Sequence, residues 1–86
     1  MKEKFVCSFI YHGLVGGILE LDDEAIVYKC NKLTIPNKYK HLLMSRFEIK
    51  EMTWNNLIVS IHMNNDETYK FLVFNKSKFI KAYENK

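Results

Sequence analysis

Apolar and polar side chains alternate along most of this chain, and a period of two residues is typical of half-buried β-strands. Residues 5–11 are dense in β-forming side chains. Two further runs, 17–21 and 25–30, lie on either side of an acidic turn at residues 22–24, so this stretch predicts a β-hairpin. Residues 12–17 hold the only three glycines of the chain, which permit positive φ angles or a close approach of backbone.

The middle of the chain is less regular. Residues 29–41 contain the single proline, Pro36, and predict a short strand and a connecting loop. Alternation resumes in residues 42–44 and 47–49, which are separated as a bulge or a change of strand would separate them. Further strands are predicted at residues 52–54, 57–63 and 68–74, joined by a two-residue turn with left-handed φ at Asn55-Asn56 and a turn at residues 64–67.

The last strand is followed by a short amphipathic helix, predicted at about residues 76–84. Asn75 is a good N-cap, and Phe74 and Phe79 have the spacing of a hydrophobic staple. An isolated helix of about two and a half turns is not stable in water. Its apolar face must therefore pack against the sheet, and we expect it to cover an open end of that sheet.

The length of 86 residues allows one domain, residues 1–86, and about seven short strands at this turn spacing are typical of a barrel or sandwich. Residues 5–11 are too short and too often interrupted by polar groups for a secretion signal, and no apolar run could span a bilayer. We therefore expect a cytoplasmic protein, with peripheral contact to a membrane left open. Cys7 and Cys30 are then reduced and packed as small apolar groups, the alternative being a disulfide between them.

Three runs resemble a known family: GGILELDDEAIVY at residues 16–28, FEIKEM at residues 47–52, and YKFLVFNK with the helix after it from residue 69. Their pattern and order are similar to the second hairpin, the middle strand, and the closing strand and capping helix of GRAM and other pleckstrin-homology-like (PH-like) domains. The resemblance covers about residues 5 to 83. It implies a mainly β fold: a partly open barrel of about seven antiparallel strands in two near-orthogonal sheets, with strands between about residues 5 and 74 and a C-terminal helix as cap.

Domains of this kind bind phosphoinositides, acidic membranes or protein segments, and most are not catalytic. The resemblance therefore implies a non-catalytic binding module, an adaptor for a protein segment or an anionic phospholipid surface. One difference concerns phosphoinositides. Members that bind them carry several Lys or Arg residues in the first hairpin, whereas residues 12–17 here hold a single histidine.

A basic segment is the first candidate ligand site, because no acidic residue lies between residues 29 and 47 and clustered cations attract anionic headgroups. The alternative is a solvated loop whose lysines protect a strand edge. The candidate residues are Lys29, Lys32, Lys38, Lys40 and His41. Lysines on the predicted helix either extend this patch or keep the outer helix face hydrated.

Apolar side chains at turns are the second kind of candidate site. Trp54 lies beside the Asn55-Asn56 turn and either anchors a partner or covers one mouth of the barrel. Leu14 and Val15, among the glycines, form another candidate anchor loop.

Catalytic and metal-binding residues are not predicted. The cysteines and histidines lack paired metal-site spacings, and a thiol within an apolar strand is inert, so we expect no enzyme and no cofactor. The acidic residues of 20–24 are assigned to turn chemistry, because they lack the alternating ligands of a calcium-binding loop.

Two classes of function therefore remain. The first is the PH-like adaptor, which would bind through the basic face or by strand addition at the sheet edge opposite the helix. The alternative is a small β-barrel that binds nucleic acid, against which the net charge of +3 and the burial pattern of the aromatic residues argue. Self-association through an exposed strand edge is a further possibility.

Overall fold

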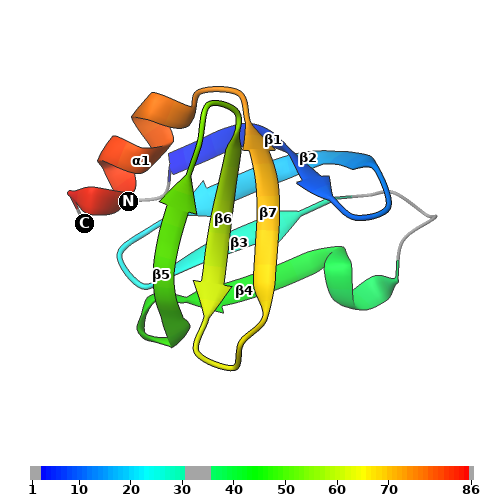
Figure 1. Ribbon diagram of the computed structural model, residues 1–86, viewed down its shortest axis with the longest axis horizontal. Helices are drawn as coiled ribbons and strands as arrows, with labels where there is room; N and C mark the ends of the chain where they lie inside the picture. The colour runs from blue at the N-terminus through cyan, green and yellow to red at the C-terminus, as the bar shows by residue number, and fades with distance from the viewer. Residues whose placement is uncertain (1–2, 31–35, 86) are drawn as a thin grey trace.

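The computed structural model describes residues 3–30 and 36–85. In these residues seven strands precede one α-helix, and two short 3₁₀ turns, η1 and η2, flank the fourth strand (Figure 1). The elements are β1 (Glu3–Ile10), β2 (Leu14–Leu21), β3 (Ala25–Lys29), η1 (Asn37–Tyr39), β4 (His41–Ser45), η2 (Arg46–Glu48), β5 (Ile49–Trp54), β6 (Ile58–Met63), β7 (Thr68–Val73) and α1 (Lys76–Glu84). The mainly β class, the seven strands and the single C-terminal helix are thus confirmed.

All seven strands form one antiparallel sheet in the order β4-β3-β2-β1-β7-β6-β5. We expected two near-orthogonal sheets, and the hydrogen bonds instead join both halves through β1. That strand pairs with β2 over its whole length. It pairs with β7 through residues 7–9, which face residues 71–73. In the described part of the chain β4 pairs only with β3 and β5 only with β6, so these two strands are the edges.

The sheet curls over its own inner face. The ring centroids of Tyr28 on β3 and Phe71 on β7 lie 5.3 Å apart, although two strands separate β3 from β7 in the sheet. In Figure 1, β5, β6 and β7 run vertically in front of β2, β3 and β4, which run across the view. Alternate residues of both halves meet in this interior, and the core consists of Phe5, Cys7, Phe9, Val15, Leu19, Leu21, Ile26, Tyr28, Met44, Val59, Ile61, Met63, Phe71, Val73, Phe79 and Ile80.

The helix α1 covers one end of this curled sheet. Phe79 and Ile80 are buried, and the Phe79 ring meets the Phe5 ring edge to face at a centroid distance of 5.1 Å. The two ends of α1 are held by segments that flank β5. Lys76 Nζ donates to the Asn55 main-chain oxygen at 2.6 Å, and the Arg46 guanidinium donates to the Tyr83 main-chain oxygen at 3.1 Å.

Two local predictions around α1 and β5 are wrong. Asn75 is the N-cap residue but its side chain makes no capping hydrogen bond, and Phe74 is 69% exposed instead of packing on Phe79 as a staple. Phe74 continues the outward-facing positions of β7, and this placement directs it to solvent. Asn55 and Asn56 have no positive φ; the Asn55 side-chain oxygen instead accepts from the N–H groups of Leu57 and Ile58 and closes a wider turn.

Residues 31–35, part of the irregular segment, lie outside the described residues; of the rest, Lys29 ends β3, Asn37–Tyr39 forms η1 and His41 begins β4. Cys7 and Cys30 are free thiols. None of the described helical residues forms a helix with the length and apolar character that crossing a membrane requires.

Candidate functional site

The described basic candidate residues lie around the start of β4, and one of them, Lys29, is paired with a carboxylate. Lys29 on β3 faces His41 on β4, and its Nζ lies 3.3 Å from Oε1 of Glu20. Glu20 is buried on β2, where its carboxylate balances the positive charge of Lys29; its assignment to turn chemistry is therefore wrong. Lys38 Nζ lies 4.9 Å above the Tyr39 ring. Two residues complete the set: Lys40, which precedes β4, and Lys32, which lies outside the described residues.

The anchor candidates separate into exposed and buried groups. Leu14 is exposed, whereas Val15 lies in the core opposite Phe9, because successive residues of β2 point to opposite faces. Val15 is therefore not available to a partner in this structure. Trp54 is 45% exposed at the end of β5.

An apolar corner lies where the β5–β6 turn meets the β7–α1 junction, and Trp54 precedes that turn at the end of β5. Leu57 in the turn and Phe74 after β7 are exposed there, and a hollow of about 440 Å³ lies between them, with Lys76 on its border. Residues 56–57 and 72–77, which line this hollow, contain Lys76 and no Asp or Glu. The corner is therefore apolar with a lysine at its border.

A second candidate site lies along the free edge of β4. Cys30 N donates to Lys40 O at one end of the β3–β4 pair, and Arg46 N donates to Glu24 O at the other end. Between these two bonds, every second residue pair of the antiparallel ladder is hydrogen-bonded. Leu42 and Met44 consequently bond to β3, whereas the N–H and C=O groups of His41, Leu43 and Ser45 are directed away from β3. This edge is an unpaired template for another strand.

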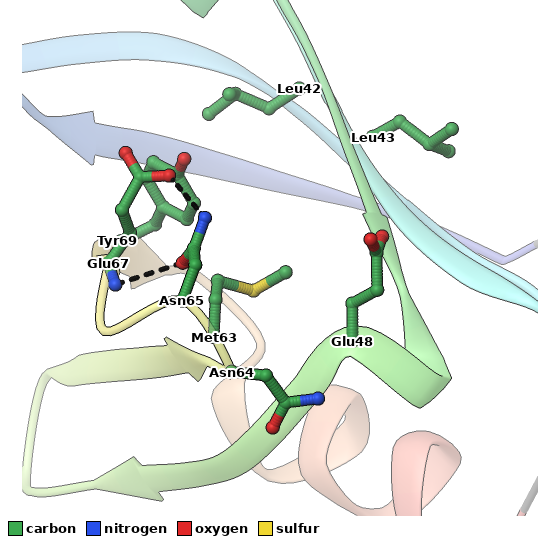
Figure 2. A pocket seen from close by; sticks show the side chains of 8 residues that line it. All are labelled: Leu42, Leu43, Glu48, Met63, Asn64, Asn65, Glu67 and Tyr69. Carbon is green, nitrogen blue, oxygen red and sulfur yellow. Dashed lines mark hydrogen bonds between the residues drawn. The ribbon is translucent and has the colours of Figure 1, made fainter.

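A pocket of about 300 Å³ opens beside this edge, between β4 and the β6–β7 turn (Figure 2). Figure 2 shows Leu42 and Leu43 pointing to opposite sides of β4, with the Met63 side chain projecting into the space below them. The Glu48 side chain rises from η2 towards β4. The pocket is lined by Leu42, Leu43, Glu48, Met63, Asn64, Asn65, Glu67 and Tyr69.

Two carboxylates give this pocket its electrostatic character. Glu67 is positioned by Asn65, whose Nδ2 donates to Glu67 Oε1 at 2.8 Å and whose Oδ1 accepts from the Glu67 N–H at 3.0 Å. Burial, followed by the neighbouring Glu67 carboxylate, raises the pKa of Tyr69, so this phenol remains neutral. No Lys, Arg or His is among the described residues that line the pocket. The arrangement favours a cationic guest.

The outer side of β4 carries another hollow, of about 420 Å³. Its apolar part is formed by Ala25, Leu43, which is 67% exposed, and Phe47, which is 84% exposed. Leu43 lines both this hollow and the pocket beside the β6–β7 turn. The free edge of β4 is thus bordered by a cavity on each face.

Sequence reasoning missed the residues of these two cavities. Glu48 comes from η2, Glu67 from the β6–β7 turn and Tyr69 from β7, and the curl of the sheet brings Glu48 to the other two, so no local sequence spacing predicts the pocket. The exposed Phe47 beside the strand change was the one available signal, because a large aromatic side chain there is not required by the core.

Metal binding and nucleophilic catalysis are the two remaining kinds of site to compare with the described residues. They hold no group of three or more His, Cys, Asp or Glu side chains placed to bind a metal ion. Burial, with a smaller effect of Cys30, raises the pKa of the Cys7 thiol to about 12, which opposes formation of a nucleophilic thiolate. His62 lies between the hydroxyl oxygens of Thr53 and Thr68, at 2.9 and 3.1 Å.

No protein-family model and no curated protein sequence matches this chain. Among solved structures, it is similar to the C-terminal domain of an unknown protein from Leishmania infantum, with a TM-score of 0.78 and 12% sequence identity. The similarity covers 93% of this chain and 76% of that chain. At this identity the likeness shows a shared fold, and fold alone does not carry function.

Proposed function

We propose that this chain is a non-catalytic binding module of the PH-like kind, and that it takes up an extended segment of another protein at the free edge of β4. The PH-like assignment is supported by the succession of seven antiparallel strands and one C-terminal helix, by the curl of the sheet and by the helix at one end. It also rests on the sequence resemblance described above.

The observation that carries the binding proposal is an unpaired strand edge with a cavity on each face. Main-chain groups of His41, Leu43 and Ser45 offer alternating donors and acceptors to an added strand, which supplies affinity that does not depend on sequence. The neighbouring cavities accept side chains of that strand, which supplies selectivity. In Figure 1, β4 runs across the lower half of the view and α1 lies at the upper left; Arg46, directly after β4, reaches the last turn of α1.

The test uses a blocked seven-residue peptide of alternating Thr and Val with a central Lys. Titrated into ¹⁵N-labelled protein, it is expected to shift the amide resonances of His41, Leu43 and Ser45 in a saturable manner. The same peptide N-methylated at alternate amides has lost its strand-pairing donors and is expected not to bind. Equal binding of both peptides, or shifts confined to the other free edge at Met52 and Trp54, would refute strand addition at β4.

A second candidate function, docking on an anionic phospholipid surface, is favoured by the exposed apolar side chains of Leu57 and Phe74 at the apolar corner, with Trp54 at the adjacent end of β5. Large apolar side chains beside Lys76 fit a bilayer whose headgroups are negative, and each lysine near such a surface contributes about 1 kcal/mol. Trp54 is the single tryptophan of the chain, so its fluorescence reports contact directly. A blue shift with phosphatidylserine-containing vesicles, absent with phosphatidylcholine alone and reversed by salt, is the expected result; no shift would exclude this corner.

A further inference from the structure

The geometry of the β4 edge also constrains which segment it accepts; this inference rests on the proposed strand addition. Successive side chains of a strand point to opposite faces of its sheet, and Figure 2 shows this alternation for Leu42 and Leu43. A strand paired with β4 continues the sheet, so its own side chains alternate between the same two faces. One set then enters the pocket beside the β6–β7 turn, and the other set meets the outer hollow.

The inner pocket fits a long basic side chain. Leu42, Met63 and the Tyr69 ring provide apolar wall for an aliphatic stem, and the carboxylates of Glu48 and Glu67 lie at the border, where a charged end group would arrive. A carboxylate on the guest would meet two like charges, and a neutral apolar guest would leave both without a counterion. Lysine and arginine have both the aliphatic stem and the positive charge that match the lining of this pocket.

The outer hollow fits a large apolar side chain. Leu43 and Phe47 are the exposed apolar side chains of this hollow, and neither is needed by the core. The charged groups of this hollow are of both signs, Arg46 against Asp23 and Glu24, whereas those of the inner pocket are carboxylates alone. Two nitrogens of Arg46 are already bonded to the main-chain oxygens of Asp22 and Tyr83. Covering Leu43 and Phe47 would remove apolar surface from water.

We infer that the segment carries a Lys or Arg and a large apolar residue separated by an odd number of positions. Odd separation places the two side chains on opposite faces of the added strand, one for each cavity. An even separation places both on one face, where either the charge or the apolar group has no matching cavity. The five residues of β4 limit the paired part of the segment to about the same length.

Blocked eight-residue threonine peptides with one Lys and one Leu test this pattern. The reference has Lys at the fourth position and Leu at the seventh; in the comparison peptides norleucine or Glu replaces Lys, or Leu moves to the sixth position. We expect norleucine to weaken binding about tenfold, as the loss of one charged interaction of about 1.4 kcal/mol would. Glu and the even-spaced peptide are expected to bind at least as weakly.

The protein variants locate the preference. Glu48→Gln combined with Glu67→Gln keeps both side-chain shapes, and we expect it to bring the Lys and norleucine peptides to equal affinity. Glu84→Gln, at the end of α1, is the matched control and should keep the preference. Circular dichroism and the amide spectrum establish that each variant is folded.

Each outcome bears on a different claim. If all peptides bind equally with shifts at Leu43, strand addition stands and the inferred pattern is wrong. If the preference for Lys persists in the double variant, the carboxylates are not its source and the inference is overturned. If no peptide shifts the β4 amides, the proposed function and the inference fail together.

Discussion

Arg46 is the side chain that fastens the helix cap to the sheet, and replacing it by Met is our most detailed prediction. Its Nε donates to the Asp22 main-chain oxygen in the β2–β3 turn, and its Nη1 donates to the Tyr83 main-chain oxygen in the last turn of α1, both at 3.1 Å. The guanidinium carbon lies 4.3 Å from the centroid of the Tyr83 ring. A cation at this end of a helix also opposes the negative end of its dipole.

The expected loss follows from these contacts. Two hydrogen bonds from a charged donor contribute about 3 kcal/mol together, and the cation–π contact adds about 0.5–1 kcal/mol. Against this, Nη2 is buried without a partner among the described residues, and removing it recovers about 1–2 kcal/mol. Met retains the apolar stem, so Arg46→Met should reduce the free energy of unfolding by about 2 kcal/mol and Tm by about 8–16 °C.

Urea and thermal denaturation followed by circular dichroism measure this loss. Lys78→Met, which changes an exposed lysine of the same helix, is the matched control and is expected to stay within about 0.5 kcal/mol of the wild type. An Arg46→Met variant as stable as the wild type would show that Phe79 and Ile80 alone hold α1, and that the guanidinium adds nothing.

Two further predictions concern the core. Gly17→Ala is expected to cost about 1–3 kcal/mol, because its Cβ would lie 2.5 Å from a main-chain oxygen of β3 and 2.7 Å from the Tyr28 ring, whereas Gly16→Ala meets open space and should be nearly neutral in the same urea titration. The raised pKa of Cys7, about 12 against an ordinary 9.0, means that the unfolded chain loses this proton before the folded chain does. The contribution of Cys7 to the free energy of unfolding is therefore fully present below about pH 9 and is lost between pH 9 and 12, by up to about 1.4 kcal/mol per pH unit. Urea midpoints at pH 8 and 10.5 should show this fall, and Cys7→Ala should reduce it without abolishing it, since burial also raises the pKa of Tyr28; an unchanged slope in Cys7→Ala would exclude Cys7 as a source.

Local patterns predicted most strands and the helix, because the signal for each depends on residues that are close together in sequence. The alternation of residues 42–49 breaks at Ser45-Arg46, and β4 ends there, η2 intervenes and β5 begins. The apolar face of residues 79–83 predicted a helix docked on the sheet, and Phe79 is fully buried against Phe5. Asp22, assigned to turn chemistry, does accept from the N–H groups of Glu24 and Ala25 in the β2–β3 turn.

Features that depend on partners distant in sequence were not predictable in this way. The charge of Lys29 looks available in the sequence, and only the pairing of β2 with β3 brings Glu20 to it. Likewise, Val15 and Leu14 are equivalent as apolar loop residues until the register of β2 decides which one faces the core. The edge position of β4 follows from the order of all seven strands, which no single segment specifies.

The same feature that leaves β4 unpaired also builds the pocket next to it. After β4 the chain enters η2, and when it emerges its main chain is already bonded to the end of β6: the Asn64 N–H donates to Glu48 O at 2.8 Å, and Asn64 Nδ2 donates to Phe47 O at 3.1 Å. These bonds hold η2 against the end of β6, and β5 then pairs with β6 and not with β4. Glu48 and Phe47 are consequently held beside the open edge, one lining the inner pocket and the other the outer hollow. An open edge usually invites unselective association, and here carboxylates on its inner side and an apolar surface on its outer side restrict what can pair with it.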